Sequence, residues 1–390
     1  MRHLIKDENV HVTVVAPVPW FPFTHKFFGK YGQFARAPRY ENRNSVDVYH
    51  PRYLVLPKIG MRVTPHSLYK AGLAQIKALL ASGQKFDVID AHYFFPDGVA
   101  AAQISSKLGI PFTVTARGSD VTEIGHMAPF DQWITQAAAQ AGQVMTVSES
   151  LRQGLIDLGV DAAKIKTLRN GVDLTMFQPE DYSHARRKLC DDLNLSIPIG
   201  DGNRQPLFFT SVGWLIKRKR HDLAISIAAR YENSHLFIIG EGEEEASLRA
   251  HAQALGVAER VHFLGRIAHD RLKNYLSAMD VLMLMSEREG WPNVLLEAMA
   301  CGTPVLARSV GGVEEFVNVP QAGAAVDSDQ VDDLHKGMEA VLANYPNRKD
   351  VRAYAEGFSW AETSKAQYVI FRRLAVQNTP STPDKNKGAE

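Results

Sequence analysis

The stretch DVLMLMSEREGWPNVLLEAMACGTPVLARS, residues 280–309, predicts the fold of the second half of the chain. An apolar run of strand length leads through a Gly-Trp-Pro-Asn turn into a helix, and Gly302 and Pro304 end that helix before a second apolar run. A strand, a helix and a strand in this order form a βαβ unit with parallel strands. The helix therefore begins at the carboxyl edge of a sheet, the edge at which open parallel sheets bind ligands.

Short apolar runs alternate with longer amphipathic stretches on both sides of this unit. A first series of expected strands reads VHVTVVAP, FDVIDAH, PFTVTA, VMTVS and IKTLRNG, within residues 10–171. A second series reads PLFFTSVG, HLFIIG, VHFLG, DVLMLMS, PVLARS and AGAAV, within residues 206–326. Helices are expected over 68–81, over 98–108 and after Ser148. The pattern predicts two Rossmann-like, doubly wound α/β domains that face a cleft.

The length of 390 residues also fits two domains. The expected segments are a first domain over 1–178, a linker over 179–205, a second domain over 206–358, a helix over 359–376 that crosses back onto the first domain, and a disordered tail over 377–390.

The composition excludes several classes of function. With 44 Lys and Arg against 43 Asp and Glu, the net charge of +1 drives the chain neither onto nucleic acid nor onto an anionic membrane. The distant Cys190 and Cys301 support neither a disulfide framework nor a zinc site. No apolar run approaches the ~20 residues of a membrane span, and the first residues lack the apolar core of a secretory signal. A cytoplasmic protein is expected.

Two acidic residues, Glu289 and Glu297, lie at the start of the helix in the 280–309 stretch, with seven residues between them. The N–H groups and dipole at a helix N-terminus favour an anion such as a diphosphate, and carboxylates accept hydrogen bonds from sugar hydroxyls. Alternatively, Glu289 is a loop charge and Glu297 complements the helix dipole.

The segment EGWPNVLLEAMACGTPV, residues 289–305, resembles the E-x7-E signature of retaining family 4 glycosyltransferases, which have the GT-B fold. By this resemblance Glu289 contacts hydroxyls of the transferred sugar and Glu297 contacts the nucleotide ribose. Gly290, Asn293 and Val294 would also lie on the donor side.

A second resemblance is carried by SVGWLIKRKRHDLAI, residues 211–225, which is similar to the family's V-G-R-L-x-x-x-K-G-x-D loop. It places Gly213 at the donor and Lys219 on the lysine that neutralises the donor diphosphate, and Asp222 matches as well. Trp214 replaces the family's arginine and cannot make its charged bidentate contacts.

Arg220 stands at the family's glycine position in this loop. Lys217, Arg218 or Arg220 would have to substitute for the missing arginine, and we assign Arg218 to the donor side. Alternatively, the basic run of residues 217–220 is an ordinary solvated surface segment. GEGEEEASLR, residues 240–249, resembles the family's G-x-G turn, in which Gly242 approaches the donor or simply permits a tight turn.

RNGVDLTMFQP, residues 169–179, resembles the family's N-G-V-D-x-x-x-F-x-P junction. We expect a hinge that lines the cleft, with a structural role for Asp173.

In the first domain, HYFFPDG and TARGSD follow successive expected strands and so reach the same rim. They resemble the H-x-x-x-P-D-G and R-G-x-D motifs of bacterial polysaccharide-type members, including the teichuronic-acid-type subgroup. The resemblance assigns His92 and Asp97 to the acceptor side, Arg117 to phosphate or acceptor contact, and Asp120 to a structural hydrogen-bonding role. His92 could instead be an ordinary packing residue.

Family members normally open with a strand, a Gly-containing loop and a helix, whereas this sequence starts in what resembles the end of that helix. We therefore expect the first βα unit to be absent and the first sheet to show a gap. Residues 19–43 interleave aromatic with basic residues: Trp20, Phe21, Phe23, Phe27 and Phe28 with Lys26, Lys30, Arg36, Arg39 and Arg43. This composition suits peripheral contact with the inner face of a membrane or with a lipid-diphosphate acceptor, or else an ordinary packed loop; no nucleic-acid motif accompanies it.

The sequence thus predicts an enzyme that moves a sugar, with retention, from a nucleotide-diphosphate sugar to a glycan or lipid-linked acceptor in cell-surface polysaccharide biosynthesis. Glu289, Lys219 and His92 are the expected catalytic residues. No cofactor or metal is expected, because a lysine and a helix N-terminus supply the positive charge. A nucleotide-sugar epimerase and an inactive sugar-nucleotide-binding subunit remain the alternatives.

Overall fold

The computed structural model describes residues 2–8, 10–21, 25, 29–55, 60–199 and 205–378. The chain divides into two compact units. Unit 1 comprises Met1–Val147, Leu151–Leu168 and Ser364–Glu390, and unit 2 comprises Ser148–Ser150 and Arg169–Thr363.

Unit 2 is built on a sheet of six parallel strands in the order β12-β11-β10-β13-β14-β15. These strands are β10 (Leu207–Val212), β11 (Ser234–Ile239), β12 (Val261–Phe263), β13 (Val281–Leu284), β14 (Val305–Arg308) and β15 (Gly323–Val326). Chain order runs outward from β10 in one direction and from β13 in the other. A topological switch point therefore lies between β10 and β13, the position at which such sheets bind ligands.

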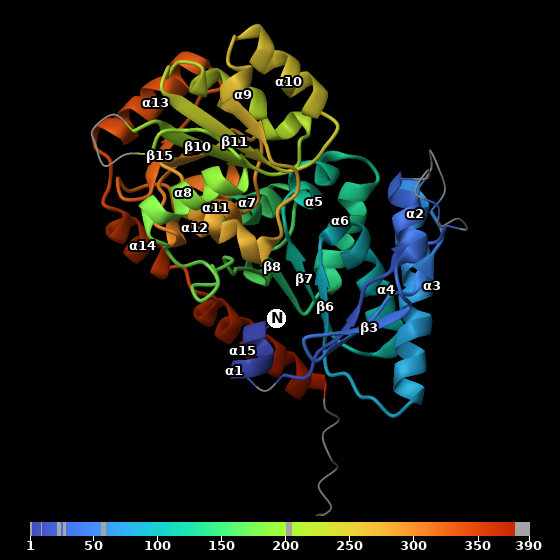
Figure 1. The fold of residues 1–390 in the computed structure, drawn as a ribbon. Coiled ribbons are helices and arrows are strands. Elements are labelled where there is room, and N and C mark those ends of the chain that lie inside the picture. Colours follow the sequence, from blue (N-terminus) through green and yellow to red (C-terminus); the bar gives the residue numbers. More distant parts are fainter. Residues whose placement is uncertain are drawn as a thin grey trace, which may run out of the picture. The chain divides into compact units, whose positions relative to one another are not determined.

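Helices cover both faces of this sheet (Figure 1). One face carries α9 (His221–Ala228), α10 (Glu245–Ala254) and α13 (Val331–Ala343), and the other carries α8 (Tyr182–Asp192), α11 (Leu272–Ser277) and α12 (Asn293–Ala300), with α14 (Arg348–Glu356) against α12. The two faces bury separate apolar clusters, one with Ile225 and Met283 and the other with Leu189 and Phe208. Both clusters are almost fully excluded from solvent, so the sheet is the centre of the core.

The segment expected as a linker, 179–205, instead contains α8, which packs into unit 2. The segment is charged and interrupted by Pro and Gly, a composition that is typical of a linker. Arg186 is only 1% exposed, and its guanidinium lies 3.7 Å from the centre of the Phe208 ring and donates to the carboxylate of Asp280. A buried charge that is paired and stacked in this way is part of a core, although the segment that carries it has the composition of a surface segment.

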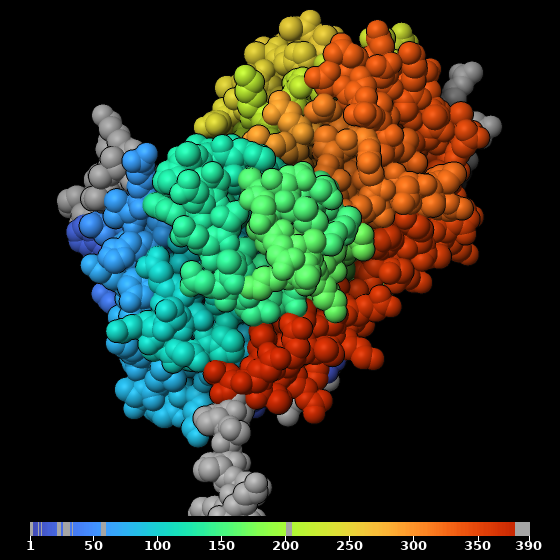
Figure 2. Space-filling view, turned by 180° about the vertical axis from the view of Figure 1, so that it is seen from behind, coloured from blue at the N-terminus to red at the C-terminus, as the bar shows by residue number. Residues whose placement is uncertain are grey.

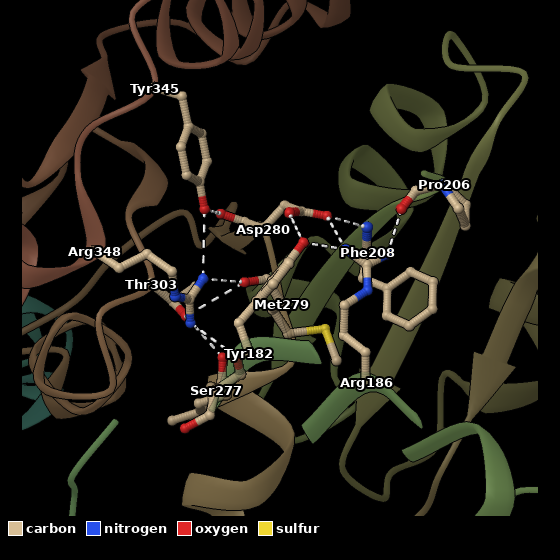
Figure 3. Close-up of polar contacts among 11 residues, drawn as sticks. Tyr182, Arg186, Pro206, Phe208, Ser277, Met279, Asp280, Thr303, Tyr345 and Arg348 are labelled. Carbon is tan, nitrogen blue, oxygen red and sulfur yellow. Dashed lines mark hydrogen bonds and ion pairs between the residues drawn. The ribbon is translucent and has the colours of Figure 1, made fainter. Parts of the chain in front are cut away.

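Asp280 and Arg186 belong to a polar cluster at the amino edge of the sheet, where the strands begin, and Asp280 is its centre (Figure 3). Its carboxylate accepts hydrogen bonds from the Phe208 N–H (2.6 Å) and the Tyr182 hydroxyl (2.5 Å), besides the Arg186 guanidinium (3.3 Å). Arg348, from α14, donates to the carbonyls of Met279 and Ser277, each at 2.8 Å. The cluster therefore ties α8 and α14 to the same end of the sheet.

The described residues of unit 1 form three small sheets. The largest has four parallel strands, β6 (Ile89–His92), β7 (Phe112–Ala116), β8 (Gln143–Thr146) and β9 (Ile165–Thr167), in sequence order. In the second sheet β1 (Thr13–Val15) pairs parallel with β4 (Val46–Tyr49), which pairs antiparallel with β3 (Tyr40–Arg43); β2 (Val18–Pro19) and β5 (Arg52–Tyr53) form the third. Among the described residues, β1 and β6 are edge strands of separate sheets.

The helices of unit 1 are α1 (Arg2–Asp7), α2 (Gly29–Arg36), α3 (Gly60–Ala81), α4 (Val99–Leu108), α5 (Ser119–Thr122), α6 (Phe130–Gln140), most of α7 (Glu149–Asp157) and most of α15 (Trp360–Asn378). From Ser364 onward α15 lies on unit 1, where Figure 2 shows it in red against the blue-green surface. Leu374 packs with Met145, and Arg373 donates to the Gln143 side chain at 2.7 Å.

Every strand of the two expected series is present within a few residues of its predicted position. The aromatic and basic stretch contains α2 and β3 as well as loops, while Phe23, Lys26, Phe27 and Phe28 lie outside the described residues, as does most of the expected tail. Among the helices in the described ranges, none combines the length and hydropathy of a membrane span.

Candidate functional site

Two charged side chains meet at the carboxyl edge of unit 2, on either side of the switch point. Lys219 follows β10 and Glu289 follows β13, and the Lys219 Nζ donates to Glu289 Oε1 at 2.6 Å. Both side chains are largely buried, with exposed fractions of 16% and 10%. The sequence assigned these residues to one site from two separate motifs, and the structure brings them together.

The loop after β10 is fixed along its length. The Leu215 side chain is fully buried, and its N–H donates to the Glu241 carbonyl at 2.9 Å. His221 is buried beneath the loop, where it contacts the Ser211 hydroxyl (2.8 Å) and the Trp214 carbonyl (3.2 Å). Burial lowers the pKa of His221 to about 4, so this imidazole is a neutral structural group.

Arg220, at the position where the resemblance expects glycine, has a left-handed backbone with φ 48° and ψ 45°. Glycine adopts this conformation without strain, which gives the physical reason for the family's preference. The guanidinium of Arg220 forms a bidentate ion pair with Asp222, its shortest contacts being 3.0 Å. In this structure Arg220 is therefore engaged with Asp222.

Arg218 joins the two loops at the switch point. Its Nη1 donates to the Arg288 carbonyl at 3.1 Å, and its own carbonyl accepts from the Glu287 N–H at 2.9 Å. These contacts hold the β10 loop against the β13 loop, and so hold Lys219 beside Glu289.

Two glycines bring backbones closer than a side chain would allow. A Cβ on Gly242 would lie 2.2 Å from the Leu215 carbonyl oxygen, and one on Gly311 would lie 1.8 Å from the Glu289 carbonyl oxygen. Gly242, expected near the donor, thus has a sufficient structural reason to be glycine. Gly311 holds the loop after β14 against the Glu289 backbone, a contact that the sequence did not indicate.

Glu297 lies on α12, about one turn after the helix begins at Asn293. Its Oε1 accepts a hydrogen bond from His269 Nε2 at 2.8 Å, and the Glu297 side chain is 12% exposed. This hydrogen bond raises the pKa of His269, although burial opposes the rise. We did not predict His269; it follows β12 at the same edge of the sheet, so inspection of every loop after a strand would have found it.

Three further residues that the resemblance assigns to the donor side also lie at this edge of the sheet. Gly213 follows β10, with its backbone beside the Lys219 side chain, and Gly290 and Val294 flank the turn into α12. Trp214, which replaces the arginine, is 64% exposed. A large aromatic side chain on a fixed backbone therefore faces solvent directly after Gly213.

The N-G-V-D junction packs within unit 2. The Asn170 side chain donates to the Asn293 side chain at 3.2 Å, and a Cβ on Gly171 would lie 2.4 Å from the Ser359 backbone. Asp173 Oδ1 accepts hydrogen bonds from the backbone of Thr175 and Met176, as expected of a structural aspartate. Asn293, at the start of α12, is thus linked to the junction.

In unit 1, His92 and Arg117 lie in contact. Arg117 Nη2 donates to His92 Nδ1 at 2.6 Å, and His92 Nε2 lies 3.1 Å from Asp90 Oδ2. A guanidinium only donates, so Nδ1 is the unprotonated nitrogen and Nε2 donates to the carboxylate. Asp90 also accepts from the Gln367 side chain of α15 at 3.1 Å. Both nitrogens of His92 are therefore engaged, and this geometry provides no free base.

Asp120 is fully buried, and its carboxylate accepts from the N–H groups of Phe94 (2.9 Å) and Gly118 (2.8 Å), as its expected structural role requires. Burial nevertheless raises its pKa. Asp97 also has a raised pKa, of about 6, and burial is again the main cause. A carboxyl group that titrates near pH 6 can exchange a proton with a ligand hydroxyl more readily than an ordinary aspartate.

The carboxyl edge of unit 2 therefore combines a buried cation, carboxylates that accept hydrogen bonds, and the N-terminus of α12. This set suits a ligand that carries a diphosphate and several hydroxyls. The described residues hold no group of three or more His, Cys, Asp or Glu side chains placed to bind a metal ion.

The comparisons with known proteins agree with this chemistry. Residues 198–358 match the family described as glycosyl transferases group 1, and residues 2–176 match the family described as Glycosyltransferase Family 4. Together the two matches cover most of each unit.

Curated relatives are 26–29% identical to this chain. TuaC of Bacillus subtilis, a glycosyltransferase whose name assigns it to teichuronic acid biosynthesis, is 28% identical over 315 residues, 79% of this chain and 75% of that protein. The D-inositol 3-phosphate glycosyltransferase of Rhodococcus jostii is 29% identical over 313 residues, 75% of this chain and 67% of that protein.

Solved structures share the fold over nearly the whole chain. Sucrose-phosphate synthase from Thermosynechococcus elongatus superposes with a TM-score of 0.77 at 20% identity, covering 96% of this chain and 92% of that one. HepE of Anabaena, in complex with UDP-glucose, superposes with a TM-score of 0.70 at 18% identity, covering 94% of this chain and 100% of that one.

Proposed function

This chain belongs to family 4 of the glycosyltransferases and has the GT-B fold, and we propose that it moves a hexose, with retention, from a nucleotide-diphosphate sugar to a glycan or lipid-linked acceptor in cell-surface polysaccharide synthesis. The observation that supports this most is the Lys219–Glu289 pair at the switch point of unit 2. UDP-glucose in the HepE complex and the teichuronic acid assignment of TuaC support the donor and the pathway class.

The proposed reaction breaks the bond between the sugar C1 and the diphosphate oxygen. Lys219 and the N-terminus of α12 stabilise the charge on the departing diphosphate, while Glu289 accepts hydrogen bonds from the sugar hydroxyls. The acceptor oxygen attacks C1 from the face that the diphosphate leaves, and its proton passes to the diphosphate. Configuration at C1 is retained without a protein nucleophile, through an oxocarbenium-like state.

We place the acceptor on unit 1, near Arg117 and Asp97. His92 was expected to be catalytic, but its contacts with Arg117 and Asp90 favour a different role, in which it orients the guanidinium. Asp97 has the raised pKa of a group suited to contact an acceptor hydroxyl.

The proposed transfer uses no bound metal, because Lys219 and a helix N-terminus already offset the charge of the diphosphate. Activity should therefore be unchanged after treatment with EDTA, measured as release of nucleoside diphosphate; a complete loss that Mg²⁺ or Mn²⁺ restores would contradict this part of the proposal.

A cytoplasmic enzyme with a lipid-linked acceptor would work at the membrane face. Trp20 follows β2 and Leu54 follows β5, and these paired strands leave both side chains at least half exposed; Arg39, just before β3, is exposed as well. We propose that this surface makes the peripheral contact. Wild-type protein should cosediment with vesicles that contain anionic phospholipid, and Trp20→Ser should reduce the bound fraction; equal binding of both variants would contradict it.

The test of function is a transfer assay with a panel of UDP- and GDP-sugars and lipid-diphosphate or oligosaccharide acceptors. Product configuration is read by NMR. Wild-type protein should form an α-glycoside from an α-linked donor, and Glu289→Ala should form almost none. Glu287→Ala, an exposed glutamate in the same loop, is the matched control and should stay active. Free epimerised nucleotide sugar with no glycoside would establish the epimerase alternative instead, and donor binding without turnover would establish the inactive subunit.

A further inference from the structure

We propose that His269 is a positioning residue of the nucleotide subsite, which holds the Glu297 carboxylate in the orientation that receives the ribose hydroxyls. This inference rests on the proposed function, because it presumes that a nucleotide binds at the carboxyl edge of unit 2. It adds a residue that none of the sequence motifs contains.

The contact between the two side chains is specific. His269 is the first residue of the short 3-10 helix His269–Arg271, in the segment that follows β12, and Glu297 lies on α12. His269 Nε2 lies 2.8 Å from Glu297 Oε1. The imidazole is 61% exposed whereas the carboxylate is 12% exposed, so the histidine lies on the solvent side of the pair.

The ring of His269 is oriented from a second direction. It packs against the Phe177 ring in a T-shaped arrangement, with 66° between the ring planes and 5.1 Å between the centroids. Phe177 is 1% exposed, and its N–H donates to the Asp173 carbonyl at 2.8 Å, so this aromatic surface is rigid. A fixed ring plane turns a single hydrogen bond into an orientational constraint on the Glu297 carboxylate.

The hydrogen-bond capacity of the carboxylate leaves room for a ligand. Each carboxylate offers about four lone-pair sites on two oxygens, and the imidazole N–H uses one of them. The two neighbouring hydroxyls of a ribose can use two of the others. Without His269, Glu297 would have to be ordered at the moment of binding, and that entropy cost would weaken the complex.

The charges around His269 favour this arrangement. Glu297, Asp173 and Asp270 all act to raise the pKa of the imidazole, and burial acts against them. The protonated ring donates a stronger hydrogen bond to the carboxylate than the neutral ring does.

The test measures binding of UDP and of 2′-deoxy-UDP to the full chain by calorimetry. It uses wild type, His269→Ala, His269→Gln, Glu297→Ala and the His269→Ala/Glu297→Ala double variant. Comparison of the two nucleotides isolates the ribose hydroxyl, which a merely structural role would not affect. His335→Ala is the matched control, since His335 faces Glu339 in a similar pair on α13 at 3.7 Å.

Wild-type protein should prefer UDP to 2′-deoxy-UDP. His269→Ala should weaken UDP by about 5- to 20-fold and remove most of this preference, as expected for loss of a charge-assisted hydrogen bond. His269→Gln, which retains a donor, should restore part of it. In the Glu297→Ala background His269→Ala should have no further effect, because the histidine acts through the carboxylate.

Unchanged UDP binding by His269→Ala, or an equal loss for UDP and 2′-deoxy-UDP, would overturn the inference and leave the proposed function intact. If wild-type protein bound none of UDP, ADP and GDP, the proposed function itself would fail, and this inference with it.

Discussion

The two ends of the sheet in unit 2 bury carboxylates to the same extent and use them differently. At the amino edge the Asp280 side chain is 11% exposed, and at the carboxyl edge the Glu289 side chain is 10% exposed. Asp280 accepts hydrogen bonds from a guanidinium, a phenol and a backbone N–H. In the described part of the chain the Glu289 carboxylate makes one hydrogen bond, to the Lys219 side chain.

This difference separates a structural cluster from a binding site. A buried carboxylate whose partners are all fixed parts of the fold stabilises the packing around it. A buried carboxylate with one side-chain partner keeps acceptor capacity for a ligand, and that lysine can instead pair with an incoming anion. Partner number, and not burial, therefore distinguishes the two ends.

The largest expected effect is on stability at the amino edge. Asp280→Ala leaves the Arg186 guanidinium buried without its carboxylate, which should cost about 3–5 kcal/mol in the free energy of unfolding. Urea denaturation measures this cost. Asp332→Ala, at a carboxylate that is 75% exposed, should change stability by less than about 0.5 kcal/mol. Equal stability of the two variants would contradict the structural role of the cluster.

At the carboxyl edge the expected loss is in turnover. Lys219→Ala should lower kcat by about 10²–10³-fold, because the diphosphate loses a charge that stabilises its departure. It should cost less stability than Asp280→Ala does. The transfer assay and urea denaturation together check both statements, with the exposed Lys188→Ala as control. If Lys219→Ala lost stability but kept a normal kcat after refolding, the assignment of Lys219 to turnover and not to stability would be contradicted.

A smaller effect is expected at Trp214. Its side chain is largely exposed, so Trp214→Arg should leave stability within about 0.5 kcal/mol of wild type. The added guanidinium should bind the diphosphate and tighten UDP by about tenfold, about 1.4 kcal/mol. Calorimetry with UDP checks the affinity. Weaker binding would mean that the indole itself contacts the nucleotide.

The smallest expected effect is the pH dependence of the stability that the His269–Glu297 pair contributes. The pKa of His269 is raised by Glu297, so the pair stabilises the folded state most fully below the ordinary imidazole pKa of 6.5, and this contribution is lost as pH rises through the raised value. The cost of His269→Ala should be at most about 1 kcal/mol, because the imidazole is exposed. Urea denaturation at pH 5.5 and pH 8.5 should show the cost only at the lower pH. A cost that grows with pH would contradict this assignment.

Most of the strands were predictable because they are repeated apolar runs, whereas β2 to β5 of unit 1 were not predicted. Lys219 and Glu289 were predicted to lie together because each follows a strand in a loop that resembles a family motif. The amino-edge cluster was not predictable in the same way. Arg186 lies in a segment with the composition of a surface linker. Only the position of Asp280 in the fold shows that the charge of Arg186 is paired and buried.

Two roles also depended on three-dimensional contacts. The sequence placed His92 at a functional rim, but only the structure shows its nitrogens engaged by Arg117 and Asp90. His269 belongs to no motif, and its importance follows from its contact with Glu297, which is 28 residues away in sequence.

The most direct test of the account is calorimetric titration of UDP-glucose, ADP-glucose and GDP-mannose into the full-length wild-type, Lys219→Ala and Lys188→Ala proteins. The account predicts that wild type and Lys188→Ala bind at least one of these donors equally well, and that Lys219→Ala binds it at least about tenfold more weakly. Equal binding of that donor by Lys219→Ala, or no binding of any donor by wild type, would contradict the claim that the switch point of unit 2 holds a nucleotide sugar.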